Sequence, residues 1–220
     1  MTAPATTGLP SASDQAERLI ALGVHERAEL TATALRDAAR ALPDGDDGRS
    51  LLAVHPAVAP ASVLTSLLRR ADKPGFVVVD MADVDSFGPI DGISVPNGPV
   101  YLAQRPDRGD EMANWSPDEA LPAILGAGRS PLLLTEGIAW LLQRVEVLER
   151  GRCFMTIGSR LRRPDGRGDA RTPAIWISGG TGRDGAANRN APKVGWCWAG
   201  NRHTWLGFAS CAGRVGPAAR

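Results

Sequence analysis

The feature that most constrains the fold of this chain is a change of sequence pattern near residue 150. Before it, apolar residues recur at helical spacing; after it, short β-branched and aromatic runs alternate with Gly- and Pro-rich turns. We expect helices over residues 14–22, 25–42, 61–70, 117–126 and 136–149. We expect strands over residues 51–54, 76–80, 100–103, 153–157, 174–178, 194–198 and 204–209. The pattern predicts an α+β fold, in which a helical N-terminal part packs on a mixed or antiparallel C-terminal sheet.

The chain of 220 residues has the length of one large domain or two small ones. Neither half looks able to bury a full core alone. We therefore expect a single domain over residues 13–220, helix-rich over 13–150 and strand-rich over 151–216. Residues 1–12 are expected to form a disordered tail.

Charge is distributed unevenly along the chain. Residues 153–220 hold 11 Lys and Arg against 3 Asp and Glu, and residues 1–152 hold 14 against 21, so the net charges are +8 and −7. Such asymmetry marks an anion-binding half, or two halves that pack together and neutralise each other. The basic residues are diluted by Gly and Pro, and no helix-turn-helix, zinc-finger or RNA-binding signature is present. We expect no nucleic-acid partner.

No segment has the pattern of a membrane span or a secretory signal. The longest apolar runs, such as residues 76–79, are strand-sized and far short of the ~18 residues that cross a bilayer. The N-terminus lacks the basic and apolar regions of a signal peptide. Three cysteines, an odd number, fit reduced thiols better than a disulfide framework. We expect a cytoplasmic protein with no membrane partner.

The stretch richest in chemistry is residues 195–211, which holds three of six Trp, two of three Cys and one of three His. In a strand, Trp196 and Trp198 would share one face and Cys197 would point to the other. A turn signal at residues 200–201 predicts a β-hairpin with a polar loop.

Large aromatic side chains beside a polar turn are typical of a small-molecule pocket. The expected binding residues are Trp196, Trp198 and Trp205 as walls, Asn201 and Arg202 at the loop, and Arg160 as a second cation for an anionic ligand. His203 would transfer protons, because the unperturbed pKa of His lies nearest physiological pH. Cys197 or Cys211 would be an optional nucleophile. The alternative is that the Trp side chains are core and the polar triplet only makes a turn.

Two other motifs carry alternatives. Cys153, Cys197, His203 and Cys211 are the right ligand types for zinc, although no C-x₂₋₄-C pair is present. Residues 180–185 match G-x-G-x-x-G, but a poor helix former follows them, which favours a surface loop over a dinucleotide site. We expect no cofactor, with zinc as the alternative.

Several longer motifs carry a family resemblance. They are residues 73–76, 89–92, 108–111, 128–132, 136–139, 158–160 and the segment Gly-Trp-Cys-Trp-Ala-Gly-Asn-x-His-Thr-Trp-Leu-Gly from Gly195. Over residues 73–216 the chain resembles an uncharacterised actinobacterial family, a domain of unknown function. The resemblance implies a cytoplasmic bacterial protein and no particular activity. Arg202 and Ala212 depart from the pattern, which has Pro and Gly there.

These observations lead us to expect a small-molecule enzyme of bacterial specialised metabolism, with its pocket in the C-terminal β region and its reaction class open. The first alternative is a non-catalytic module that senses a ligand or binds a protein, with the Trp side chains as core or interface anchors. The second is a zinc-stabilised module.

Overall fold

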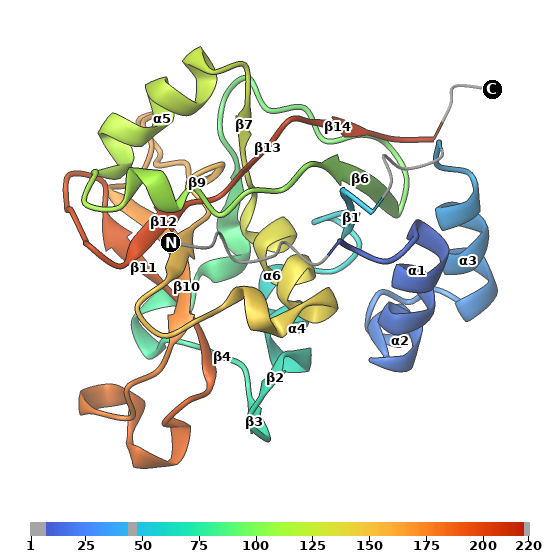
Figure 1. The fold of residues 1–220 in the computed structure, drawn as a ribbon, viewed down its shortest axis with the longest axis horizontal. Coiled ribbons are helices and arrows are strands. Elements are labelled where there is room, and N and C mark those ends of the chain that lie inside the picture. Colours follow the sequence, from blue (N-terminus) through green and yellow to red (C-terminus); the bar gives the residue numbers. More distant parts are fainter. Residues whose placement is uncertain (1–7, 44–47, 218–220) are drawn as a thin grey trace.

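The fold is α+β, as the pattern predicts. A computed structural model describes residues 8–43 and 48–217. Within them the chain forms a three-stranded sheet, a five-stranded sheet and two-stranded ribbons, with helices packed against the sheets (Figure 1). Part of the expected tail, residues 1–7, lies outside the described residues. The rest of it is packed, because Leu9 is buried and its N–H donates to the carbonyl of Gly48 at 2.6 Å.

Short helices are distributed over the first two thirds of the chain. They are α1 (Ala12–Ala21), α2 (Val24–Arg27), α3 (Ala32–Arg40), α4 (Ala61–Leu67), α5 (Pro117–Gly126) and α6 (Leu134–Gln143). Single 3-10 turns are η1 (Val79–Met81), η2 (Val84–Ser86), η3 (Asp110–Met112), η4 (Val145–Val147), η5 (Gly182–Asp184) and η6 (Ala186–Asn188). None of the helices in the described part of the chain combines the length and apolarity that a membrane crossing requires.

The three-stranded sheet joins the two ends of the chain. Its antiparallel strands are β1 (Ser50–Val54), β6 (Val100–Gln104) and β14 (Gly213–Val215), in the order β1-β6-β14. In Figure 1, α1, α2 and α3 gather beside this sheet and away from the larger one. The C-terminal segment therefore returns to complete a sheet that the N-terminal part begins.

The side chain of Gln15 on α1 closes the free edge of β1. Its amide nitrogen donates to the carbonyls of Ser50 and Pro10, both at 2.8 Å, and its amide oxygen accepts from the N–H of Leu52 at 2.8 Å. Gln15 is fully buried, and it substitutes for a neighbouring strand over two residues of the edge.

The five-stranded sheet is mixed. Its order is β12 (Leu206–Phe208), β8 (Cys153–Met155), β10 (Arg171–Ile177), β11 (Pro192–Trp198) and β4 (Phe76–Val77). The three central strands are antiparallel, while β12 runs parallel to β8 and β4 parallel to β11. The two-stranded ribbons are β2 (Arg69–Arg70) with β3 (Lys73–Pro74), β5 (Phe87–Pro89) with β9 (Ser159–Leu161), and β7 (Ser130–Pro131) with β13 (Ser210–Cys211).

Helix α6 lies at the centre of the molecule and is buried along its whole length. It packs against both large sheets, and Gly137 permits its close approach to the five-stranded one. A Cβ atom at this glycine would come within 2.6 Å of Thr156 Cγ2 and 3.1 Å of Ile175 Cδ1. The two sheets therefore share one core around α6.

A buried ion pair ties α6 to the last strand. The Arg214 guanidinium donates to both carboxylate oxygens of Glu136, at 2.6 and 2.7 Å, and both side chains are at most 5% exposed. Tyr101 and the N–H of Leu133 also donate to this carboxylate, at 2.9 and 2.7 Å. The remaining donors of Arg214 reach Ser130 Oγ and the carbonyl of Pro131. Each partner in this cluster is satisfied, which a buried charge requires.

The structure confirms the start of α5 in detail. Ser116 is its N-cap, Pro117 is its first residue, and Glu119 completes the capping box by accepting from the N–H of Ser116 at 2.8 Å. Strands β1 and β6 also lie where the sequence places them.

Four other predicted elements need correction. The helix expected over residues 14–22 is α1, which begins two residues earlier, at Ala12, because Ser11 caps it. The helix expected over residues 25–42 is two helices, because Thr31 caps a new one. The strand expected over residues 76–80 is cut short by η1. The helix expected over residues 136–149 is α6, which begins at Leu134 and ends at Gln143, and the 3-10 turn η4 follows it.

Candidate functional site

The segment over residues 195–211 does not form the expected hairpin. Strand β11 pairs with β10 and β4, whereas β12 pairs with β8 at the opposite edge of the sheet. The turn itself exists, since the N–H of Asn201 donates to the carbonyl of Trp198 at 3.0 Å. The chain does not fold back on β11 after this turn. It crosses β10 and β8 and then pairs with the outer edge of β8, where Leu206 lies beside Cys153.

The tryptophans of this segment are divided between the two faces of the sheet. Trp196 and Trp198 share one face, as predicted, with ring centroids 4.5 Å apart in an edge-to-face pair, and Trp198 is 49% exposed. Trp176 lies on the opposite face, because it occupies the space into which a Cβ of Gly195 would point, 2.6 Å from Trp176 Cη2. Trp205 contacts Trp176, with 6.2 Å between the rings. A single pocket walled by Trp196, Trp198 and Trp205 is therefore wrong.

The sheet face that carries Trp176, called here the Trp176 face, also carries Trp205, His203 and Lys193. The ring of His203 lies 5.4 Å from that of Trp205, and Lys193 Nζ lies 4.8 Å from the centroid of Trp176. Trp205 thus contacts both His203 and Trp176, and Lys193 contacts Trp176. Such a cation over an aromatic face is favourable when it is partly desolvated.

The polar turn is docked onto the start of α5. The N–H of Asn114 donates to the carbonyl of His203 at 2.8 Å, and the N–H of Asp118 donates to the carbonyl of Ala199 at 3.1 Å. Arg202 is ion-paired with Glu119, and Asn201 is exposed. His203 Nε2 is buried without a hydrogen-bond partner among the described residues. Arg202 therefore neutralises an acidic side chain of α5 in this structure.

Arg160 makes its hydrogen bond outside this turn. It lies on β9 and donates to the carbonyl of Asp169 at 2.6 Å, while its Nε is buried without a partner among the described residues. Burial lowers the pKa of this guanidinium, although the carboxylates of Asp118 and Asp169 oppose the effect.

The three thiols lie on three different strands. Cys153 is on β8, Cys197 on β11 and Cys211 on β13. Burial raises the pKa of each thiol to about 11. A thiol with this pKa is neutral at physiological pH and is a poor nucleophile. The structure therefore shows no activated thiolate at Cys197 or Cys211.

The same placement separates the four residues that the sequence suggested as zinc ligands. Over residues 8–43 and 48–217, no group of three or more His, Cys, Asp or Glu side chains is arranged to hold a metal ion. The four ligands that the sequence suggested, Cys153, Cys197, His203 and Cys211, are not gathered at one point.

A pocket of about 340 Å³ opens at the β4 edge of the five-stranded sheet, and we call it the β4 pocket. One wall is the apolar run of residues 76–79, which continues β4 into η1. The other is the loop that follows β10. The polar side chains around it are Asp80, Thr181, Arg183, Asp184, Asn188 and Lys193. An apolar wall with a few polar groups is the usual make-up of a small-molecule site.

The base of the β4 pocket is a nearly buried ion pair. Lys193 Nζ donates to both carboxylate oxygens of Asp184, at 2.8 and 2.9 Å, and the two side chains are 14% and 12% exposed. Ser178 also donates to this carboxylate, at 2.8 Å. At the rim, Arg183 pairs more loosely with Asp80 at 3.4 Å, and the Arg183 side chain is 76% exposed. The pocket therefore combines a nearly buried ion pair with an exposed cation.

The sequence analysis did not single out Lys193 and Asp184 as site residues, although both are of a type that is rare in this part of the chain. Lys193 is one of two lysines in the chain, and Asp184 is one of three acidic residues after residue 152. Asp184 belongs to the G-x-G-x-x-G match, which we expected to be a surface loop. After Gly185 the loop forms the 3-10 turn η6 and no α-helix, and it contributes one wall of the β4 pocket.

Comparison with known proteins settles the family. A family model described as a family of unknown function (DUF5701) matches residues 18–217. The chain belongs to the DUF5701 family. No curated protein and no solved structure matches it.

The match to DUF5701 covers the whole candidate site. Residues 18–217 include both large sheets, α6, the β4 pocket and the segment 195–211. The N-terminal turns of α1 precede the matched region. The β4 pocket of this chain therefore lies within the matched region.

Proposed function

We propose that this chain binds a small molecule in the β4 pocket. The observation that supports the proposal is the ion pair of Lys193 and Asp184 at the base of a pocket with one apolar wall. Its volume of about 340 Å³ falls within the range of small-molecule sites, roughly 300–1,000 Å³. Lys193 also contacts the ring of Trp176, which adds an aromatic side chain to its surroundings.

The ligand that fits this pocket has an apolar part and an anionic group. Residues 76–79 offer a wall of Phe and Val side chains for the apolar part. Arg183 is exposed and held only by a 3.4 Å pair, so its guanidinium is free to swing onto a carboxylate or phosphate of the ligand. Lys193 is held by Asp184, so we assign it a positioning role at the base.

A catalytic role is the second candidate, and it rests on His203. Its Nε2 atom is buried without a partner among the described residues, and its ring lies on the Trp176 face. In this version the chain is a small-molecule enzyme and His203 transfers a proton. For this version we keep the cytoplasmic, actinobacterial and specialised-metabolic setting that the sequence led us to expect.

Ligand binding is tested with a matched pair of lysine variants. A metabolite library is screened against the full chain by thermal shift, and each hit is measured by calorimetry. Lys193→Met removes the cation at the base, whereas Lys73→Met removes the exposed lysine of β3. We expect hits to bind wild type and Lys73→Met equally and Lys193→Met at least about 10-fold more weakly. Hits that bind all three proteins equally would place the ligand elsewhere.

The catalytic version is tested with a matched pair of histidine variants. Any ligand found is followed for turnover by mass spectrometry with wild type, His203→Gln and His25→Gln, the last changing a histidine of α2. Turnover that His203→Gln abolishes and His25→Gln retains would support the enzyme. Binding without turnover in all three would leave a non-catalytic ligand-binding module.

A further inference from the structure

Two arginines from distant segments of the chain converge on one asparagine. Arg70 Nη1, on β2, donates to the carbonyl of Asn190 at 3.2 Å, and Arg150 Nη2 donates to Asn190 Oδ1. Asn190 lies at the end of the loop between β10 and β11, which Figure 1 shows in the lower part of the view, on the same side of the molecule as the β2–β3 ribbon. We call Arg70, Arg150 and Asn190 the Asn190 cluster.

The backbone holds the residues of the Asn190 cluster in place. Arg150 is in a tight turn that two hydrogen bonds close, from the N–H of Glu149 to the carbonyl of Arg152 at 3.2 Å and back at 3.1 Å. Asn190 adopts a left-handed backbone conformation with φ of 72°, and its N–H donates to the carbonyl that follows β10 at 2.9 Å. Arg70 belongs to the paired ribbon. The two guanidinium groups therefore meet on a residue whose position is fixed.

Neither guanidinium group of the Asn190 cluster has a carboxylate partner. Over the part of the chain that the structure describes, Arg70 and Arg150 form no ion pair with Asp or Glu. Glu149 is engaged by Arg108 at 3.5 Å, and Asp72, at the tip of the ribbon, is exposed and makes no ion pair with a described residue. The two cations therefore share only the neutral oxygens of one asparagine.

Other positive charges lie close to the Asn190 cluster in the chain. Arg70 and Lys73 are direct partners across the ribbon, and the exposed Arg189 immediately precedes Asn190. Like charges opposite each other on two strands destabilise the pair. An anion bound beside Arg70 would relieve this repulsion.

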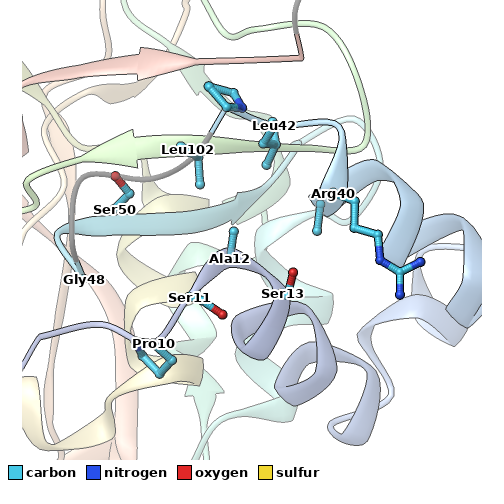
Figure 2. Close-up of a pocket in the computed structure, with 11 residues that line it drawn as sticks. Pro10, Ser11, Ala12, Ser13, Arg40, Leu42, Gly48, Ser50 and Leu102 are labelled. Atoms are coloured by element: carbon cyan, nitrogen blue, oxygen red, sulfur yellow. The ribbon is translucent and has the colours of Figure 1, made fainter.

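The segments that form the Asn190 cluster, residues 68–78, 148–153 and 176–193, are described without gaps. The pocket of about 480 Å³ in Figure 2 differs in this respect. It lies between α1, α3 and the three-stranded sheet, and residues 44–47 beside it are outside the described residues. That pocket therefore carries no inference.

We propose that the Asn190 cluster binds the phosphate group of a small soluble ligand. A guanidinium group donates two parallel hydrogen bonds to a phosphate, and these charge-assisted bonds are stronger than bonds to a neutral amide oxygen. A phosphate also has enough oxygens to accept from Arg70 and Arg150 at once, in place of Asn190 Oδ1. None of the three residues lines the β4 pocket, so the site goes beyond the binding proposed there and does not depend on it.

The test uses inorganic phosphate and pyrophosphate as probes for the full chain, titrated by calorimetry at constant ionic strength. We expect saturable binding that Arg70→Gln and Arg150→Gln each weaken by about 10-fold. The control is Arg167→Gln, in the loop after β9, which removes the same charge from a side chain that is 85% exposed and should leave binding unaltered. Arg150 is exposed, so its variant tests the site even if Arg70→Gln lowers the unfolding temperature.

A further variant separates the guanidinium group from its charge. Arg150→Lys keeps the positive charge but loses the two-pronged geometry, so we expect several-fold weaker phosphate binding than in wild type. Full retention of binding by this variant would contradict the assigned role of the guanidinium group.

The two probes separate the kinds of ligand. Pyrophosphate that binds at least about 10-fold more tightly than phosphate identifies a diphosphate, and equal affinities identify a single phosphate group. Absence of saturable binding with both probes overturns the proposal. So does binding that Arg70→Gln and Arg150→Gln weaken no more than Arg167→Gln does.

Discussion

Burial of the thiols decides how the cysteines of this chain react. Because burial raises the pKa of Cys153, Cys197 and Cys211 to about 11, the reactive thiolate is scarce at pH 8. We expect iodoacetamide to alkylate the native chain far more slowly than the urea-unfolded chain, as read by intact mass. Fast modification of native Cys197 would contradict the assigned burial and revive the nucleophile hypothesis.

The same thiols make stability depend on pH at the alkaline end. Their folded pKa of about 11 lies above the value of 9.0 for an unperturbed thiol, so the folded chain holds these protons more tightly. The stability that these thiols contribute to the folded state is fully present below pH 9 and is lost as the pH rises from 9 to about 11. Urea unfolding across that window should show falling stability in wild type. The fall should be smaller in a variant with all three cysteines changed to Ala.

A single amide on α1 closes the edge of β1. Gln15→Ala would leave the carbonyl of Ser50 and the N–H of Leu52 unpaired in a buried setting, which costs about 1–3 kcal/mol. We expect this loss in the free energy of urea unfolding. Glu17→Ala, on the exposed face of the same helix, is the control and should change it far less. Equal losses in the two variants would show that the hydrogen bonds of the Gln15 amide do not contribute specifically to the free energy of unfolding.

Some residue-level features follow from strand alternation and others do not. The shared face of Trp196 and Trp198 was predictable, because alternation is a local property. The contact of Trp205 with Trp176 was not, because it depends on which strand β12 joins. The pair of Lys193 and Asp184 was missed for a similar reason: it crosses the loop between β10 and β11, and spacing alone does not show how that loop folds back.

At the scale of elements, the packing of β10 on β11 depends on a glycine. A Cβ at Gly195 would meet Trp176 Cη2 at 2.6 Å and Val78 Cγ1 at 3.1 Å, so Gly195→Ala must displace the indole. We expect a loss of about 1–3 kcal/mol and a shift in tryptophan fluorescence. Gly200→Ala, in the following turn, is the control, since nothing lies within 4 Å of its Cβ position. An unchanged Gly195→Ala protein would show that Trp176 moves freely.

Helices were predictable where local capping chemistry determines them. Helix α5 begins where Ser116, Pro117 and Glu119 dictate, because all three act within one turn. Helix α6 was misplaced, because its N-cap is Leu133 and its first residues are buried by tertiary contacts instead of being marked by a polar cap. The short β4 was overestimated, since a run of valines has strand propensity whether or not a partner strand continues beside it.

At the scale of the whole molecule, the pair of Glu136 and Arg214 joins the central helix to the last strand. Glu136→Gln leaves a buried guanidinium without its counter-charge, and we expect a loss of about 3–5 kcal/mol in urea unfolding. The double variant Glu136→Gln with Arg214→Met removes both charges and should be more stable than Glu136→Gln alone. Strictly additive losses would show that the two side chains are not coupled.

Topology was the part of the fold least accessible to sequence reasoning. Helical periodicity and β-type runs correctly indicated the α+β class. They did not show that β4 would join the C-terminal sheet or that β14 would join the N-terminal one. Both pairings depend on residues far apart in the chain, whose contacts no local pattern encodes.

The late return of β14 has a consequence for biosynthesis. Ribosomes release a chain from its N-terminus, so β6 emerges well before the strand that pairs Gly213 with Gln104. During that interval one edge of β6 has no strand to cover it, and bare strand edges recruit other chains. Prematurely terminated products would carry this open edge permanently. We expect such products to aggregate more readily than the full chain and to depend on chaperones or degradation.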